Sequence, residues 1–272
     1  IREDEPMLTG KRALVTGSTR GLGQAIARAL AGEGCDVMLN GFGDAADIER
    51  DRAALEAETG VRVRYHGGDL ATEEGADALA DAAMAAFGSV DILVNNAVIR
   101  HFHAAEDFPR AEWRKALAVN LSAPFYLIQR VLPGMRAGGW GRIVNIASVM
   151  GLAARAGRAD YITAKTGLIG LTRAIAAETR LDANVTCNAI CPGSVLTPNT
   201  EIKIAEFIAE SGLPREEAVA EFLRMRGQAM GFIQPERVAK LAVFLCQDSS
   251  LDMTGAVMPI DQGRSATWLE QD

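Results

Sequence analysis

The sequence has few cysteines and no Cys-x-x-Cys pair. Its four cysteines are Cys35, Cys187, Cys191 and Cys246, and two of them lie within one apolar run. Cysteines in such positions are ordinarily buried, reduced thiols. The sequence therefore predicts neither a disulfide framework nor a metal site, and it favours a reducing, cytoplasmic location.

The sequence also lacks an excess of positive charge and a long apolar segment. Lys and Arg together number 28 and Asp and Glu 35, which gives a net charge of −7. A protein that binds nucleic acid or an anionic membrane through its overall charge has the opposite balance. No apolar stretch approaches the roughly 18 residues of a membrane helix. We expect neither a nucleic-acid partner nor a membrane.

No internal repeat, low-complexity tract or Pro/Gly-rich linker divides the 272 residues. Hydrophobic residues make up 49% of the chain and charged residues 23%, as is typical of globular proteins. We expect a single domain over residues 7–272. Residues 1–6 are charged and precede Met7, and we set them aside as a leader or a cloning remnant.

Short apolar runs alternate with longer segments of helical periodicity. Strands are predicted at 13–15, 36–39, 61–65, 90–94, 142–146, 184–190 and 256–260, and helices at 21–32, 44–59, 72–87, 113–135 and 158–179. Connections of this length are crossovers, so the strands should be parallel. A run such as Ile92-Leu-Val94 suits a strand covered on both faces. The predicted fold is α/β, a doubly wound parallel sheet of the Rossmann type.

The pattern changes after Pro198. Two polar helical segments, 200–211 and 216–226, precede Pro235, which opens another helix. We expect the insertion 199–231 to form a helical lid over the substrate.

A glycine-rich turn follows the first predicted strand. It reads Thr16-Gly17-Ser-Thr-Arg20-Gly21-Leu22-Gly23 and leads directly into a helix. Such glycines let the backbone approach a pyrophosphate, and the helix start offers free N–H groups. The turn predicts a dinucleotide site, although glycines also serve plain tight turns.

Later predicted strands end in polar motifs that should reach the same crevice. These are Asp69-Leu70, Asn95-Asn96-Ala97 and Pro192-Gly193-Ser-Val195-Leu-Thr197. Ligands of open parallel sheets bind outside the carboxyl ends of the strands. Taken singly, Asp69 could equally be a helix cap and Pro192-Gly193 a simple turn.

Tyr161 and Lys165 stand four residues apart in a predicted helix, so their side chains share one face. A phenol titrates near about pH 10, and a neighbouring cation favours its ionised form. Ser148 follows a predicted strand, where its hydroxyl could steady a substrate oxygen. The alternative is a half-buried aromatic beside a lysine whose amine reaches the solvent.

In combination these motifs resemble the short-chain dehydrogenase/reductase family. The match runs from about Leu8 to Gly263 and comprises the glycine turn, Asp69, Asn95-Asn96-Ala97, Asn120, Ser148, Tyr161-x3-Lys165 and Pro192-Gly193. The resemblance implies that Tyr161 is the acid–base, that Ser148 polarises the carbonyl, that Lys165 holds the nicotinamide ribose, and that Asn120 holds a water linked to Lys165. It also implies a homotetramer. Val98 departs from the family, which usually has glycine there, and puts cofactor affinity in doubt.

The resemblance implies that the following residues bind the cofactor: Gly17, Thr19, Arg20, Gly21, Leu22, Gly23, Phe42, Asp69, Leu70, Asn96, Ala97, Tyr161, Lys165, Pro192, Gly193, Val195 and Thr197. The stretch 39–44 is especially similar to bacterial D-3-hydroxybutyrate dehydrogenases, which favours NAD. Arg20 instead favours NADP, because relatives that use NADP often have a basic residue there.

The same subgroup binds its substrate carboxylate with Gln, His, Lys and Gln, and the matching residues here are Arg100, Met150, Arg158 and Lys203. Three cations at one place predict an anionic hydroxy or keto acid, larger or more highly charged than hydroxybutyrate, such as a sulfonate or dicarboxylate. The alternative is that the cations are solvated surface groups and Met150 a core filler. Two other functions stay open: an NADPH-dependent 3-oxoacyl or general ketone reductase, and a non-catalytic NAD(H)-binding regulator.

Overall fold

The computed structural model describes residues 6–182, 184–228 and 230–266. Three parts of the predicted organisation lie outside these residues: most of the leader, the last six residues of the domain, and Ala229 of the lid. Within them the chain forms a seven-stranded sheet in the order β3-β2-β1-β4-β5-β6-β7, with every pairing parallel. The strands are β1 (Arg12–Val15), β2 (Asp36–Asn40), β3 (Val63–His66), β4 (Ile92–Asn95), β5 (Gly141–Ile146), β6 (Val185–Pro192) and β7 (Val257–Ile260). This confirms the predicted doubly wound parallel sheet.

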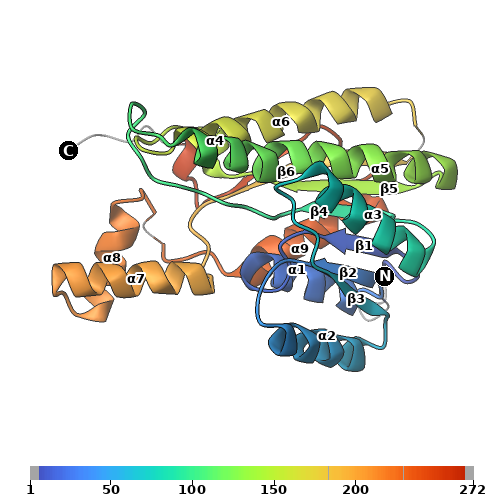
Figure 1. The fold of residues 1–272 in the computed structure, drawn as a ribbon, viewed down its shortest axis with the longest axis horizontal. Coiled ribbons are helices and arrows are strands. Elements are labelled where there is room, and N and C mark those ends of the chain that lie inside the picture. The colour runs from blue at the N-terminus through green and yellow to red at the C-terminus, as the bar shows by residue number, and fades with distance from the viewer. Residues whose placement is uncertain (1–5, 183, 229, 267–272) are drawn as a thin grey trace.

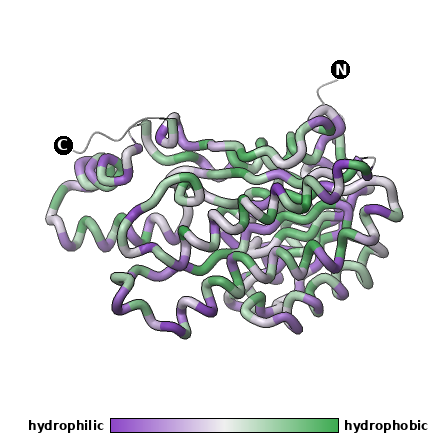
Figure 2. Tube along the Cα trace, turned by 90° about the horizontal axis from the view of Figure 1, so that it is seen from above, coloured by the Kyte–Doolittle hydropathy of each residue, from purple (hydrophilic) through white to green (hydrophobic). Residues whose placement is uncertain are grey.

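Helices cover both faces of the sheet (Figure 1). One face packs against α1 (Gly21–Gly32), α2 (Ala45–Thr59) and α9 (Pro235–Cys246), and the other against α3 (Glu73–Phe87), α5 (Ala123–Gly138) and α6 (Ala159–Thr179). Figure 2 shows hydrophobic residues along the strands between these layers. Residues of β4 and β5 are fully buried because both of their faces are covered, as the continuous apolar runs predicted. The four cysteines are buried free thiols.

The predicted helix 113–135 is interrupted in the structure. It consists of α4 (Arg110–Leu117), a π-helical turn (Ala118–Ser122) and α5. Pro124 has no N–H and so cannot make the α-helical bond to the carbonyl of Asn120. The periodicity of apolar residues did not reveal this break, which turns Asn120 into the protein interior.

Two helices, α7 (Pro198–Ser211) and α8 (Arg215–Arg224), stand apart from the sandwich at one end of the molecule (Figure 1). They correspond to the two polar helices predicted there. Thr197 caps α7 by accepting from the Thr200 N–H, and Pro198 occupies the first turn. Phe207 and Phe222, with ring centroids 5.9 Å apart, pack the two helices together.

A chain of buried polar groups joins the middle strands to α6. Asn95 Nδ2 donates to Asn145 Oδ1 at 2.8 Å, and Asn145 Nδ2 donates to Thr172 Oγ1 at 2.9 Å. Because buried amides need partners, these bonds restrict how β4, β5 and α6 pack against one another. The ends of both strands and one face of α6 meet in the site described below.

Replacing Asn145 with alanine should lower the free energy of unfolding by about 2–4 kcal/mol, because it leaves Asn95 without its partner and creates a cavity. Urea unfolding of Asn145→Ala, Asn95→Ala and the double variant measures the coupling between the two side chains. We expect a double variant less destabilised than the sum of the singles by about 1 kcal/mol. Strict additivity would show that the bond contributes nothing.

Candidate active site

A cleft of about 830 Å³ lies at the carboxyl ends of the strands. All of the predicted cofactor and substrate residues line it, together with Ser148. The structure thus brings together residues that are up to 186 positions apart in the chain, from Gly17 to Lys203. Asn120 is the predicted site residue that does not line the cleft.

The glycine turn between β1 and α1 is built for close contact with a ligand. Gly17 and Gly21 have positive φ angles of 62° and 60°. A Cβ on Gly23 would lie 2.2 Å from the Gly17 carbonyl oxygen and 2.4 Å from Asn96 Nδ2. No side chain caps α1, so its first N–H groups remain available at the cleft. This cradle fits the pyrophosphate of a dinucleotide.

The end of β4 is bonded to this turn. Asn96 Nδ2 donates to the carbonyl oxygens of Thr16 and Gly17 at 2.9 and 3.1 Å. Thr16 Oγ1 accepts from the N–H groups of Asn96 and Ala97 at 2.9 and 3.0 Å. The Asn-Asn-Ala motif therefore holds the phosphate cradle in shape.

The end of β2 forms the outer part of the cradle. Asn40 Nδ2 donates to the carbonyls of His66 and Gly68, both at 3.1 Å, and Phe42 is 63% exposed. Asp69 is no helix cap, since Thr72 caps α3; its carboxylate accepts from the Ala71 N–H and lines the cleft.

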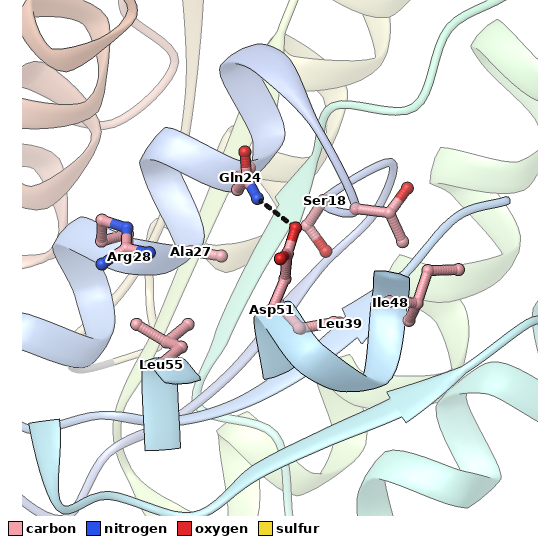
Figure 3. Close-up of a pocket in the computed structure, with 9 residues that line it drawn as sticks. Ser18, Gln24, Ala27, Arg28, Leu39, Ile48, Asp51 and Leu55 are labelled. Atoms are coloured by element: carbon pink, nitrogen blue, oxygen red, sulfur yellow. Dashed lines mark hydrogen bonds between the residues drawn. The ribbon is translucent and has the colours of Figure 1, made fainter. Parts of the chain in front are cut away.

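A second, much smaller cavity lies between α1 and α2. It measures about 20 Å³, and Gln24 Nε2 donates across it to Asp51 Oδ2 at 3.4 Å (Figure 3). A space of this size accommodates about one water, so it is not a further ligand site.

Tyr161 and Lys165 lie on the cleft-facing side of α6. The Lys165 ammonium is 5.9 Å from the Tyr161 ring centroid and donates to the Ile146 carbonyl at 2.6 Å. Lys165 is only 2% exposed, so it is not a lysine that extends to solvent. Ser148, directly after β5, lines the same part of the cleft, and its Oγ accepts from the Met150 N–H at 3.1 Å.

Cations surround Tyr161. The guanidinium carbons of Arg100 and Arg158 lie 5.8 and 5.0 Å from its ring centroid. Arg158 is 8% exposed, and its Nε has no hydrogen-bond partner in the described part of the chain. Lys203 of α7 is half-buried, and burial and then Arg100 and Arg158 lower its pKa. Arg158 and Lys203 are therefore not ordinary solvated surface charges.

Comparison with known proteins agrees with this geometry. The family model described as short chain dehydrogenase matches residues 11–206. The chain is 42% identical to D-beta-hydroxybutyrate dehydrogenase of Cupriavidus necator, over 97% of this chain and 100% of that protein. It is 40% identical to the enzyme of the same name from Rhizobium meliloti, over 94% and 99%. The crystal structure of L-sorbose reductase from Gluconobacter frateurii, complexed with NADPH and L-sorbose, superposes with a TM-score of 0.91 at 29% identity, over 97% and 100%.

The chain belongs to the short-chain dehydrogenase family. It is an oxidoreductase that interconverts a secondary alcohol and a ketone with a nicotinamide cofactor, as the sequence motifs predicted. No helix in the described ranges is long and apolar enough to cross a membrane.

Burial is the main influence on Lys165 of this dehydrogenase. Burial, and after it the positive charge of Arg100, lowers the pKa of the ammonium from an ordinary 10.5 to about 7. Any negative charge placed nearby, whether a phenolate or a substrate anion, stabilises the protonated form of a lysine in this position.

Asn120 is buried and does not line the cleft, and its side chain is bonded to the backbone of Ile99. Its Oδ1 accepts from the Ile99 N–H at 2.9 Å and its Nδ2 donates to the Ile99 carbonyl at 2.8 Å. The side chain thus fastens the segment that carries Arg100, and the water relay stays a prediction. Val98 is 37% exposed and lines the cleft, so its side chain occupies space that glycine would leave empty.

Sequence reasoning missed several residues of the site. Asp160 is fully buried; its Oδ2 bonds His101 Nδ1 at 2.9 Å and its Oδ1 accepts from the Tyr161 N–H at 2.6 Å. An aspartate directly before the tyrosine was a possible signal, but its partner His101 is 59 positions away in the chain. Arg155, Arg226 and Arg264 also line the cleft, and their patterns in the sequence resemble those of surface arginines.

Replacing Gly23 with alanine should weaken NADH binding by at least about 10-fold, since the new methyl group displaces the Gly17 carbonyl or Asn96. Fluorescence titration with NADH measures the effect. Gly134→Ala in α5 is the control, because a Cβ at that position meets no atom within 4 Å apart from its chain neighbours and the backbone of its own helix. Equal NADH affinity in the Gly23 and Gly134 variants would contradict the cradle.

The lowered pKa of Lys165 predicts that the free energy of unfolding depends on pH. Below about pH 7 both the folded and the unfolded chain carry its proton; between about 7 and 10.5 only the unfolded chain does, so the stability of the cofactor-free protein should rise with pH. Chemical unfolding at several pH values should show the parent protein gaining stability relative to Lys165→Met across this range. Parallel pH profiles would contradict a lowered pKa.

Proposed function

We propose that this dehydrogenase oxidises an anionic secondary hydroxy acid, or reduces the matching keto acid, with NAD as its preferred cofactor. The observation that carries the proposal is the convergence of Arg100, Arg158 and Lys203 on the cleft beside Tyr161. Arg158 is nine-tenths buried with an unpartnered Nε, and a buried guanidinium that lacks a partner favours an anion in the cleft. Met150 forms part of the wall.

The residues divide the chemistry among them. When bound, the nicotinamide accepts or donates the hydride. In the oxidation direction, the Tyr161 phenolate takes the proton of the substrate hydroxyl while the Ser148 hydroxyl holds the same oxygen. The Lys165 ammonium stabilises the phenolate and binds the nicotinamide ribose. In reduction, Tyr161 returns the proton to the forming alkoxide.

The preference for NAD rests on the similarity to the two D-beta-hydroxybutyrate dehydrogenases. The end of β2, Asn40-Gly41-Phe42, has no acid for the adenosine ribose, and Arg20 lines the cleft nearby. Arg20 keeps NADP as the alternative, and L-sorbose reductase was crystallised with NADPH. We further propose that 199–231 closes over the substrate, and that the enzyme is a cytoplasmic homotetramer without a metal.

The test is a panel of hydroxy acids, hydroxysulfonates and neutral alcohols, assayed by nicotinamide absorbance with NAD and with NADP. We expect turnover of anions in preference to neutral alcohols, with higher kcat/KM for NAD. Arg158→Gln should lower kcat/KM for anionic substrates by about 100-fold, because one charge-assisted bond is lost and its partners are left unpaired.

NADH affinity should be unchanged in Arg158→Gln, and Tyr161→Phe should abolish turnover of every substrate. Turnover of neutral ketones with NADPH and of no anion would support a general ketone reductase instead. Inactivity of the parent protein on the whole panel, with intact NADH binding, would favour a cofactor-binding regulator.

A further inference from the structure

Three arginines line the cleft in addition to the basic residues around Tyr161. Arg155 lies in the loop before α6, Arg226 follows α8, and Arg264 follows β7. They come from three separate parts of the chain, so no local sequence pattern explains why they face one cavity. We call them the outer arginines.

Arg226 is held in a defined position. Its guanidinium carbon lies 3.3 Å from the Phe222 ring centroid, and its Nη1 donates to the Phe222 carbonyl at 2.8 Å. Phe222 is itself buried and packs against Phe207 and Phe232. The arginine is therefore presented to the cleft by a packed aromatic support, with little freedom left to lose on binding.

The outer arginines lie close enough to repel one another. Burial lowers the pKa of Arg226 to about 10, helped by the positive charges of Arg155, Arg264 and Arg158. The pKa of Arg264 is lowered by burial and then by Arg155. Such repulsion costs free energy unless an anion lies between the cations.

The cleft supplies little compensating negative charge. Among its lining residues in the described chain, Asp69 is the one carboxylate, and it lies at the cofactor end. Arg155 and Arg226 make no ion pair with a carboxylate of the described residues, and neither do Arg100, Arg158 and Lys203. Two carboxylates outside the lining, Glu206 and Asp261, oppose the lowering of the pKa of Lys203 and of Arg264 respectively.

We propose that the outer arginines form a second anion-binding subsite, so that the substrate is a hydroxy acid that carries two anionic groups. This inference rests on the proposed function. Arg100, Arg158 and Lys203 bind the first anionic group beside Tyr161, and the outer arginines bind the second, which is a carboxylate, sulfonate or phosphonate. Arginine suits all three because its planar donors bind them in pairs.

The test compares two substrates that share one carbon chain and differ in the charge of one terminal group. 3-Hydroxyglutarate carries two carboxylates, and its monomethyl ester has the same chain with one of them masked. We expect the parent enzyme to favour the diacid by at least about 10-fold in kcat/KM. The sulfonate and phosphonate analogues of the diacid, assayed alongside, identify which second group binds best.

The variants are Arg226→Gln and Arg155→Gln, with Arg237→Gln as the control. Arg237 is exposed on α9 outside the cleft, and its substitution changes the net charge of the protein equally. We expect the first two variants to lose about 10- to 100-fold in kcat/KM for the diacid and under about 3-fold for the monoester. Arg226→Lys should lower kcat/KM for the diacid less than Arg226→Gln does, because lysine keeps the positive charge but not the paired donors. Arg237→Gln should affect neither substrate.

Equal losses on diacid and monoester, or none on either, would overturn the subsite. In that event turnover of the monoester by the parent enzyme would leave the proposed function intact. If the parent enzyme turned over neither anion but did reduce neutral ketones, the proposed function itself would fail. NADH titration and thermal unfolding of each variant separate these outcomes from misfolding.

Discussion

The buried ammonium of Lys165 is the group on which the site depends. It lies one helical turn from Tyr161, donates to the carbonyl at the end of β5, and is almost completely removed from solvent. Removing a charge from water is costly, and the lowered pKa of Lys165 reflects that cost. The cost is recovered when a negative charge develops at the neighbouring phenol. The same burial that destabilises the lone cation makes Lys165 a strong partner for any negative charge that develops beside it.

The position of this pair follows from the way the sheet is built. Asn95, Asn145 and Thr172 form a buried chain of bonds that ties two central strands to α6. Asn96 binds the glycine turn after β1 to the end of β4. Asp160 anchors the start of α6 to His101. The cradle and the proton-transferring face of α6 are thus connected through polar bonds within one packed core.

The charge distribution of the protein is uneven. The chain as a whole carries a net charge of −7, yet six basic residues converge on one part of the cleft: Arg100, Arg155, Arg158, Lys203, Arg226 and Arg264. A negative protein with a cationic cleft concentrates field lines there, because the low-dielectric walls screen the cations poorly. Overall composition led us to expect no nucleic-acid partner, but it held no information about this local excess of positive charge.

The sequence alone determined the sheet, its parallel strands, the phosphate cradle, and the place of Ser148, Tyr161 and Lys165, because each depends on residues close together in the chain or on strand periodicity. It did not reveal the π-helical turn, since one missing N–H at Pro124 leaves the apolar spacing almost unchanged. Nor could it distinguish the arginines of the cleft from surface arginines. Arg155, Arg226 and Arg264 meet because the loop before α6, the end of α8 and the end of β7 converge in space. Only the tertiary structure decides which cations are buried together, because desolvation depends on what packs around a charge and not on its neighbours in the chain.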